Sequence, residues 1–307
     1  MKTAFQPSGI YSAQWIPVDA TGRIDRASLA AHIEFERQHD IAGLLALGST
    51  GEFPHFSIDE RKQVLAAVAE LAAPLPVIAN ISDIRPRAAI ELGRFAKSLG
   101  IPAVGLMPPP FYPMGQDDVL AFFLHVAEAV DVPVMLYNFP ELTGKRIDLD
   151  TAAAFADRAP MAAIKQSGGE FAYHRDLVAL GREKGFAVMS GADTRLPEVF
   201  ALGGAGCIGG LVNIVPELMV EIHRACTSGR AAEITQTAAR MVELGRVIDQ
   251  LAFPPNVAAG LAARGFSPGA SKSILSAQSQ QLYAKIVAEL SALFARWGLA
   301  PPAAAVA

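Results

Sequence analysis

The sequence predicts a (β/α)8 barrel of the α/β class, followed by a C-terminal helical segment. Short apolar runs alternate with amphipathic helical patterns along most of the 307 residues. We count eight such units, at intervals of roughly 20 to 35 residues, which match an eightfold barrel. Glycine, proline or polar residues follow each run and end the strand. The alternative, an open doubly wound sheet, is disfavoured because no Gly-x-Gly-x-x-Gly motif follows the first run.

The apolar runs are short and continuous, as expected for parallel strands that are buried on both faces. Several end in a sharp change of composition, such as the Pro-Pro-Pro that follows the fourth run and forbids a helix directly after it. We expect strands at residues 9–17, 41–47, 76–80, 103–107, 133–137, 161–165, 186–190 and 206–209.

The segments between these runs have the three- and four-residue apolar spacing of amphipathic helices. One of them begins with Ser57-Ile58-Asp59-Glu60, which is a capping box. We expect helices at residues 25–39, 57–72, 85–99, 117–130, 149–157, 171–185, 196–202 and 216–226.

The sequence after residue 227 has no strand pattern. It predicts helices at 231–251, 257–263 and 278–297, and an Ala/Pro-rich tail that frays. We therefore expect a catalytic barrel domain at 1–227 and a helical appendage at 228–307.

The composition excludes several classes of protein. Hydrophobic residues make up 51% of the chain and charged residues 18%, which suits a large core and also contacts between subunits. The net charge of −4 comes without a basic stripe, so nucleic acid is not an expected partner. No apolar run is long enough to span a membrane, and the N-terminus lacks the apolar core of a signal peptide. We expect a soluble, cytoplasmic protein.

Lys165 is the first candidate for chemistry. It ends the apolar run Met161-Ala162-Ala163-Ile164 and precedes Gln-Ser-Gly-Gly, so it lies at the C-terminal end of a buried strand. Active sites of parallel barrels are built at this end. A desolvated lysine there favours its neutral, nucleophilic form, which forms a Schiff base with a carbonyl substrate. A lysine at a strand end can also simply extend its amine to the surface, so other residues must support this interpretation.

Three more stretches meet at the same end of the barrel. Gly48-Ser49-Thr50-Gly51 offers hydroxyls and backbone N–H groups that suit a carboxylate, although it also suits an ordinary polar turn. Tyr137 ends a strand, where its phenol can relay a proton or serve as a core aromatic with one hydrogen bond. Gly191-Ala192-Asp193 ends another strand. We expect Glu52 to organise its loop through hydrogen bonds.

The remaining polar residues do not predict a metal site. The six histidines have no ligand spacing, and two cysteines form neither a disulfide framework nor a metal quartet. His55, in the loop after the second strand, is a further residue that could reach a substrate.

Together these stretches resemble the dihydrodipicolinate synthase / N-acetylneuraminate lyase family. The matching segments, in order and separation, are Gly48-Ser49-Thr50-Gly51-Glu52, Tyr137-Asn138-Phe139-Pro140, Ile164-Lys165-Gln166-Ser167 and Ser190-Gly191-Ala192-Asp193. The resemblance implies a barrel with C-terminal helices, usually a homotetramer, that forms a Schiff base with pyruvate or another 2-oxo acid and needs no metal or organic cofactor.

The resemblance also assigns roles to residues. It makes Lys165 the Schiff-base lysine and Tyr137 the proton relay, and it places the 2-oxo acid carboxylate at Ser49 and Thr50. Tyr112 matches an aromatic that, in the synthase, reaches the site of a neighbouring subunit. The other residues that it places at the substrate are Gly51, Leu142, Gly191, Asp193 and Ile208.

Two departures bear on the second substrate. The synthase usually has an arginine, which grips the carboxylate of aspartate semialdehyde, where this chain has Leu142. The polar positions that the lyase uses for its sugar are not clearly present either, because Gly191-Ala192-Asp193-Thr194 keeps only the aspartate and Gly209-Gly210-Leu211 lacks a hydroxyl.

The expected function is therefore that of a lyase, a class I aldolase that joins or separates pyruvate and an aldehyde, as N-acetylneuraminate lyase or a 2-oxo-3-deoxy sugar-acid aldolase does. Three alternatives remain open. A sugar-acid dehydratase would use the same imine to expel water. A dihydrodipicolinate synthase is disfavoured by Leu142. A barrel that binds a small acid without catalysis would form no covalent adduct.

Overall fold

The protein is a closed barrel of parallel strands, which confirms the predicted fold. The computed structural model describes residues 5–299. The strands follow one another around the barrel in chain order, and the last pairs with the first. They are β1 (Gly9–Ala13), β2 (Gly43–Ala46), β3 (Val77–Asn80), β4 (Ala103–Leu106), β5 (Val134–Asn138), β6 (Met161–Gln166), β7 (Ala187–Ser190) and β8 (Gly206–Gly209).

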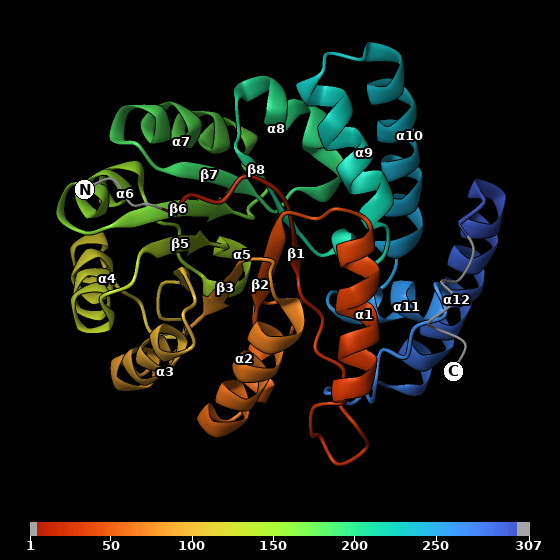
Figure 1. Ribbon diagram of the computed structural model, residues 1–307, viewed down its shortest axis with the longest axis horizontal. Helices are drawn as coiled ribbons and strands as arrows, with labels where there is room; N and C mark the ends of the chain where they lie inside the picture. The colour runs from red at the N-terminus through yellow and green to blue at the C-terminus, as the bar shows by residue number, and fades with distance from the viewer. Residues whose placement is uncertain (1–4, 300–307) are drawn as a thin grey trace.

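Helices connect the strands and form a ring around the barrel (Figure 1). Two kinds of helix occur in this part of the chain. The α-helices are α1 (Arg26–Gln38), α2 (Ile58–Ala72), α3 (Pro86–Ser98), α4 (Gln116–Val130), α5 (Pro140–Thr143), α6 (Leu149–Arg158), α7 (Phe171–Lys184), α8 (Leu196–Leu202) and α9 (Pro216–Thr227). Short 3-10 helices are η1 (Phe53–His55), η2 (Asp193–Arg195) and η3 (Leu211–Asn213).

Three more helices follow the barrel: α10 (Ala231–Ile248), α11 (Pro255–Ala263) and α12 (Ala277–Trp297). They lie together on one side of the barrel, where α10 packs against α9 and α12 packs against α10 and α11 (Figure 1). These helices confirm the predicted C-terminal helical segment. The division into domains at residue 228 stays a prediction, and most of the tail predicted to fray lies outside the described residues.

The structure differs from the prediction at two strand ends. The first strand was expected to reach residue 17 but ends at Ala13, because the backbone N–H of Trp15 leaves the ladder and donates to the side chain of Asn213 at 2.8 Å. The short helix α5 was not predicted. Its first residue is Pro140, whose fixed φ suits the first position of a helix.

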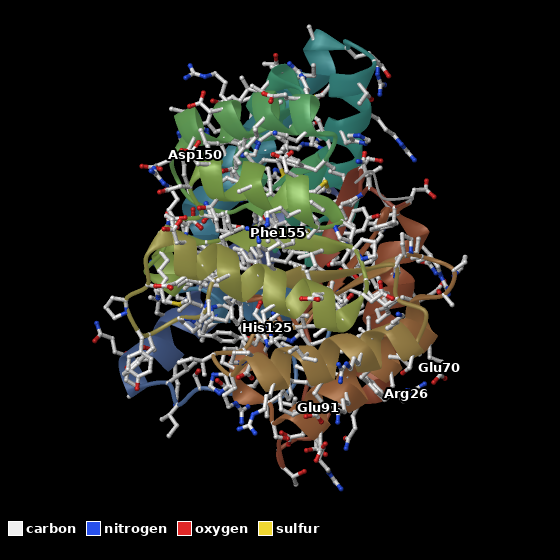
Figure 2. All side chains as sticks on the ribbon, turned by 90° about the vertical axis from the view of Figure 1, so that its left-hand side faces the viewer. Arg26, Glu70, Glu91, His125, Asp150 and Phe155 are labelled. Carbon is white, nitrogen blue, oxygen red and sulfur yellow. The ribbon has the colours of Figure 1, made fainter. Side chains whose placement is uncertain are left out.

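Two apolar layers hold the barrel. Inside it, a cluster that includes Tyr11, Ile78 and Met135 fills the space between the strands. A larger cluster lies between the strands and the helices. Helix α6 shows the amphipathic pattern, with Phe155 fully buried towards the strands and Asp150 exposed to solvent (Figure 2). Each fully buried large apolar side chain contributes about 1.5–3 kcal/mol.

Charged residues occupy the outer surface of the helices. Arg26 of α1 and Glu70 of α2 form an ion pair at 2.5 Å near the periphery (Figure 2). Exposed pairs of this kind contribute about 0–1 kcal/mol, so apolar burial stabilises the fold far more. Among residues 5–299, no helix has both the length and the apolar composition that crossing a membrane would require.

A buried polar cluster joins β1, α1 and η3. The side-chain amide of Gln14 donates to Nδ1 of His32 at 3.1 Å, and Nε2 of His32 donates to the carbonyl of Asn213 at 2.9 Å. Burial lowers the pKa of His32 to about 4, so its ring is neutral at pH 7. Glu36 accepts a hydrogen bond from Ser12 Oγ at 2.5 Å, and burial raises the pKa of Glu36 well above its ordinary value.

We expect Glu36→Gln to stabilise the protein increasingly as the pH rises. The unfolded chain releases the Glu36 proton near its ordinary pKa of 4.5, whereas the folded protein keeps it. The stability of the native protein should therefore fall as the pH rises from this value towards the raised pKa, by up to about 1.4 kcal/mol per pH unit. Glutamine has no such proton and can still accept from Ser12.

Urea unfolding at about pH 4, 6 and 8 measures this difference in the free energy of unfolding. Glu70→Gln is the matched control, because that carboxylate is 71% exposed. The assignment of a protonated Glu36 is wrong if both variants show the same pH dependence as the native protein.

Candidate active site

A cavity of about 290 Å³ lies at the C-terminal ends of the strands. Strands β5, β6 and β8 supply its floor, and the end of α10 and the start of α11 supply its outer wall. This is the end of the barrel where enzymes of this fold place their sites. The polar and charged side chains that line it are those of Thr50, Tyr137, Lys165, Ser167, Asp193, Thr194, Asp249 and Asn256.

Lys165 and Tyr137 form the centre of the cavity. They are register partners on β6 and β5, and both side chains are buried, with 4% and 1% exposed. Nζ of Lys165 donates to the hydroxyl of Tyr137 at 3.0 Å and lies 4.3 Å from the centre of its ring. A proton can therefore pass directly between the amine and the phenol.

A β-bulge produces this pairing. Val134 pairs with Met161, but the next residue, Met135, pairs with Ala163, so that β6 gains one residue. Because of this extra residue, Lys165 pairs with Tyr137 across the two strands. Bulges re-aim side chains in this way next to active sites.

The Gly48–Gly51 turn lies beside this pair. The hydroxyls of Ser49 and Tyr137 are 3.2 Å apart, and Thr50 lines the cavity. The backbone N–H of Glu52 closes the turn by donating to the carbonyl of Ser49 at 3.0 Å. Among the described residues, the hydrogen bonds of this turn do not use the backbone N–H groups of Thr50 and Gly51. These donors suit a carboxylate.

Gly51 allows the turn to approach β1 closely. A Cβ atom at this position would lie 2.9 Å from the carbonyl oxygen of Gln14, which is too near for any side chain. Gly51 therefore shapes the turn but does not line the cavity with Lys165.

Asp193 is fixed in the same cavity, beside the end of β8. Its carboxylate accepts from the backbone N–H of Leu211 at 2.8 Å and from the thiol of Cys207 at 3.3 Å. Burial raises the pKa of Asp193, although these hydrogen bonds and the charge of Lys165 act in the opposite direction. Gly191 and Ile208, also predicted, line the same cavity.

The outer wall of the cavity comes from the helices after residue 228. Asp249 follows α10, and Asn256 belongs to α11. Asn256 is 8% exposed, and its Oδ1 has no hydrogen-bond partner among the described residues. A buried amide oxygen without a partner is costly, so it is well suited to accept from a bound ligand.

Besides Ser49 and Gly51, two more predicted residues, Leu142 and Tyr112, do not line this cavity. Leu142 was expected to face the second substrate, but α5 turns the chain outwards after Pro140, and Leu142 is 50% exposed. It lines a larger, neighbouring cavity of about 710 Å³ together with Ser49 and His55. Tyr112 is also exposed, packs edge-on against Phe111, and does not line the cavity with Lys165.

Glu52, expected to organise its loop, holds an ion pair at 2.8 Å with Lys272. Within residues 5–299, no three histidine, cysteine or acidic side chains lie close enough together to hold a metal ion. The expectation of a metal-independent reaction stays a prediction.

Sequence reasoning missed the residues that come from outside the strand ends. Asp249 follows α10 and Asn256 lies on α11. The sequence pattern predicts these helices but does not show where they pack on the barrel. Ser167 did have a signal, because it follows Lys165 directly in the polar turn at the end of β6.

Comparisons with known proteins agree with this geometry. Residues 6–293 match the model of the Dihydrodipicolinate synthetase family. A 4-hydroxy-tetrahydrodipicolinate synthase of Haloarcula marismortui is 30% identical over 282 residues, which cover 91% of each chain.

Two solved structures share the fold. YagE of E. coli K12, a prophage protein of the dihydrodipicolinic acid synthase family solved in complex with pyruvate, has a TM-score of 0.87 at 26% identity, over 93% of this chain and 98% of its own. A 2-keto 3-deoxygluconate aldolase of Picrophilus torridus has a TM-score of 0.77 at 25% identity, over 81% of this chain and 90% of its own. The chain therefore belongs to the Dihydrodipicolinate synthetase family and is a lyase of the class I aldolase type.

Proposed function

We propose that this protein is an aldolase that joins or separates pyruvate and an uncharged, hydroxylated aldehyde through an imine on Lys165. The observation that carries the proposal is a line of three hydrogen-bonded groups at the strand ends, in which Lys165 Nζ lies 3.0 Å from the Tyr137 hydroxyl and that hydroxyl lies 3.2 Å from Ser49 Oγ. An amine nucleophile, a proton relay and a carboxylate-binding turn are the parts that the reaction needs.

In the cleavage direction, the amine of Lys165 attacks the ketone of a 4-hydroxy-2-oxo acid to give a carbinolamine. Tyr137 donates its phenol proton to the carbinolamine hydroxyl, which leaves as water as the iminium forms, and Tyr137 becomes a phenolate. The phenolate of Tyr137 then takes the proton of the C4 hydroxyl. The bond between C3 and C4 breaks, its electron pair moves into the iminium to form an enamine, and the aldehyde departs. Protonation of C3 and hydrolysis release pyruvate and restore Lys165. Because the iminium accepts the electron pair, the reaction requires neither a metal nor an organic cofactor.

Ser49 and Thr50 hold the carboxylate of pyruvate in this proposal. The two hydroxyls and the N–H groups of Thr50 and Gly51 supply hydrogen bonds without a cation. They fix the ketone next to Lys165, and a small displacement of this group would slow imine formation.

The charges of the cavity support an uncharged second substrate. Lys165 is the only cationic residue among the described residues that line it, and the proposed imine uses that amine. Asp193 and Asp249 are acidic, whereas Ser167, Thr194 and Asn256 are neutral and suit hydroxyl groups. An aldehyde with a carboxylate would find no cationic partner beside these two acidic side chains.

The relative named as a 2-keto 3-deoxygluconate aldolase supports the same reaction class. A sugar-acid dehydratase with the same imine is the closest alternative. Incubation with a 2-oxo-3-deoxy sugar acid separates the two activities, because only the aldolase releases free pyruvate.

A second candidate is 4-hydroxy-tetrahydrodipicolinate synthase, since that is the name of the relative at 30% identity. This activity requires a site for the carboxylate of aspartate semialdehyde. Leu142, which stands where the synthase usually has an arginine, cannot supply it.

The assembly is also part of the proposal. We infer a homotetramer in which the exposed Phe111 and Tyr112 lie against a second subunit. Their exposed fractions, 82% and 65%, are high for adjacent large aromatic residues.

Imine formation tests the proposal directly. We expect borohydride, added in the presence of pyruvate, to leave a reduced adduct of pyruvate on the protein, detected by its mass. Lys165→Ala should abolish the adduct, and Lys184→Ala, at a lysine on the outer helix α7, should keep it. An adduct that persists in Lys165→Ala would refute the assignment of the nucleophile.

We expect Tyr137→Phe to lower kcat for pyruvate release by about 10²- to 10⁴-fold, because the variant keeps the ring and loses the proton relay. Steady-state assay of pyruvate measures the loss. Tyr11→Phe is the control, since Tyr11 is also buried inside the barrel but does not line the cavity with Lys165. Equal activity of the two variants would remove Tyr137 from the mechanism.

The charge of the aldehyde provides a further prediction. With pyruvate, kcat/KM for D-glyceraldehyde should exceed that for succinate semialdehyde and aspartate semialdehyde by at least about tenfold, because a buried carboxylate without a partner costs more than 1.4 kcal/mol. Preferential use of aspartate semialdehyde would instead establish the synthase.

Two variants test whether the carboxylate of Asp249 causes this preference for an uncharged aldehyde. Asp249→Asn should raise kcat/KM for succinate semialdehyde by up to roughly fivefold, the effect of one partly exposed charge. Asp150→Asn, at an exposed carboxylate of α6, should leave it unchanged (Figure 2).

A further inference from the structure

A second buried lysine lies behind the Gly48–Gly51 turn, on the segment between α11 and α12. Nζ of Lys272 is 2.8 Å from Oε2 of Glu52, and the two side chains are only 4% and 7% exposed. Nζ also lies 4.4 Å from the centre of the Trp15 ring. Burial lowers the pKa of Lys272, and the charge and hydrogen bond of Glu52 oppose this shift.

Glu52 has a backbone conformation that needs support. Its φ of 55° and ψ of 41° are left-handed, which is unfavourable for a residue with a side chain. It directly follows Ser49-Thr50-Gly51, and its N–H closes the turn onto the carbonyl of Ser49. A change of its backbone angles would therefore move Ser49 and Thr50 with respect to Lys165.

The segment that carries Lys272 is tied to the barrel at two other points. The indole N–H of Trp15 donates to the carbonyl of Pro268 at 2.8 Å. The hydroxyl of Ser273 lies 3.4 Å from Nε2 of His55, in the 3-10 helix that follows Glu52. These contacts fix the segment on both sides of Lys272 and so hold the lysine against the turn.

We propose that the Lys272–Glu52 ion pair positions the turn that binds the carboxylate of pyruvate, so that the segment after α11 sets the affinity of the site. Both are positioning residues, because in this proposal they act on pyruvate through Ser49 and Thr50, and neither lines the cavity that contains Lys165. The inference rests on the proposed role of Ser49 and Thr50. It goes beyond that role by making the helical C-terminal part of the chain necessary for binding pyruvate tightly.

The pair is buried, so its removal has two separable effects. Loss of one partner leaves an unpaired buried charge and destabilises the fold, whereas loss of both leaves none. Loss of either partner also releases the turn. Stability should therefore recover in a double variant, but the position of the turn should not.

Borohydride trapping over a range of pyruvate concentrations tests this inference. Lys272→Met should raise the pyruvate concentration that gives half of the maximal adduct by about 10- to 100-fold, because the carboxylate-binding groups are displaced. The adduct at saturating pyruvate should still form on Lys165. Lys184→Met is the control, because it removes an ion pair of the same length, 2.8 Å to Asp157, between two outer helices.

The double variant Lys272→Met/Glu52→Gln separates positioning from stability, and it serves as the test if the single variant does not fold. We expect its melting temperature to return towards the native value while its half-saturating pyruvate stays at least about tenfold raised. A double variant that regains the native half-saturation would overturn the inference, as would a folded single variant with native half-saturation. Failure of the native protein to form any adduct would instead overturn the proposed function.

Discussion

The register between β5 and β6 is the constraint on which the candidate site depends. Side chains alternate along a strand, so a shift of one residue exchanges the faces. If the pairing of Val134 with Met161 continued without the bulge, Tyr137 would stand opposite Ile164, whose side chain packs outside the barrel. The extra residue in β6 places Lys165 there instead. The distance of 3.0 Å between amine and phenol is a consequence of this single irregularity.

The Gly48–Gly51 turn and the acidic residues of the cavity offer different partners to a ligand. The turn at Ser49 and Thr50 offers neutral donors, which bind a carboxylate without competing with Lys165 for a proton. The cavity also contains Asp193 and Asp249, and Lys165 is the only cation among the described residues that line it. In the proposed reaction, the carboxylate of the 2-oxo acid faces the turn, and the acidic residues lie beside an uncharged second substrate.

The sequence predicts the parts of the site that lie on strand ends and misses those that do not. Lys165 and Tyr137 each end an apolar run, and in a parallel barrel all such ends meet on one face. No comparable rule connects Asn256 or Lys272 to that face, because helices after the barrel can dock at several places. The role of Leu142 stays a prediction, and its position depends on a local feature that the sequence leaves open. A proline directly after a strand permits either a rigid loop or the first turn of a helix, and only the structure shows that α5 forms.

The chain contains two buried lysines close to one turn, and their surroundings explain why only one suits imine chemistry. Lys272 lies 2.8 Å from the carboxylate of Glu52 and faces the ring of Trp15, and both contacts stabilise the ammonium form. Lys165 forms no ion pair within 4.0 Å among the described residues, and its hydrogen-bond partner is the hydroxyl of Tyr137. Burial alone does not suit a lysine to imine chemistry. A carbonyl substrate in the cavity reaches Lys165, whereas Lys272 does not line that cavity and its amine is bonded to Glu52.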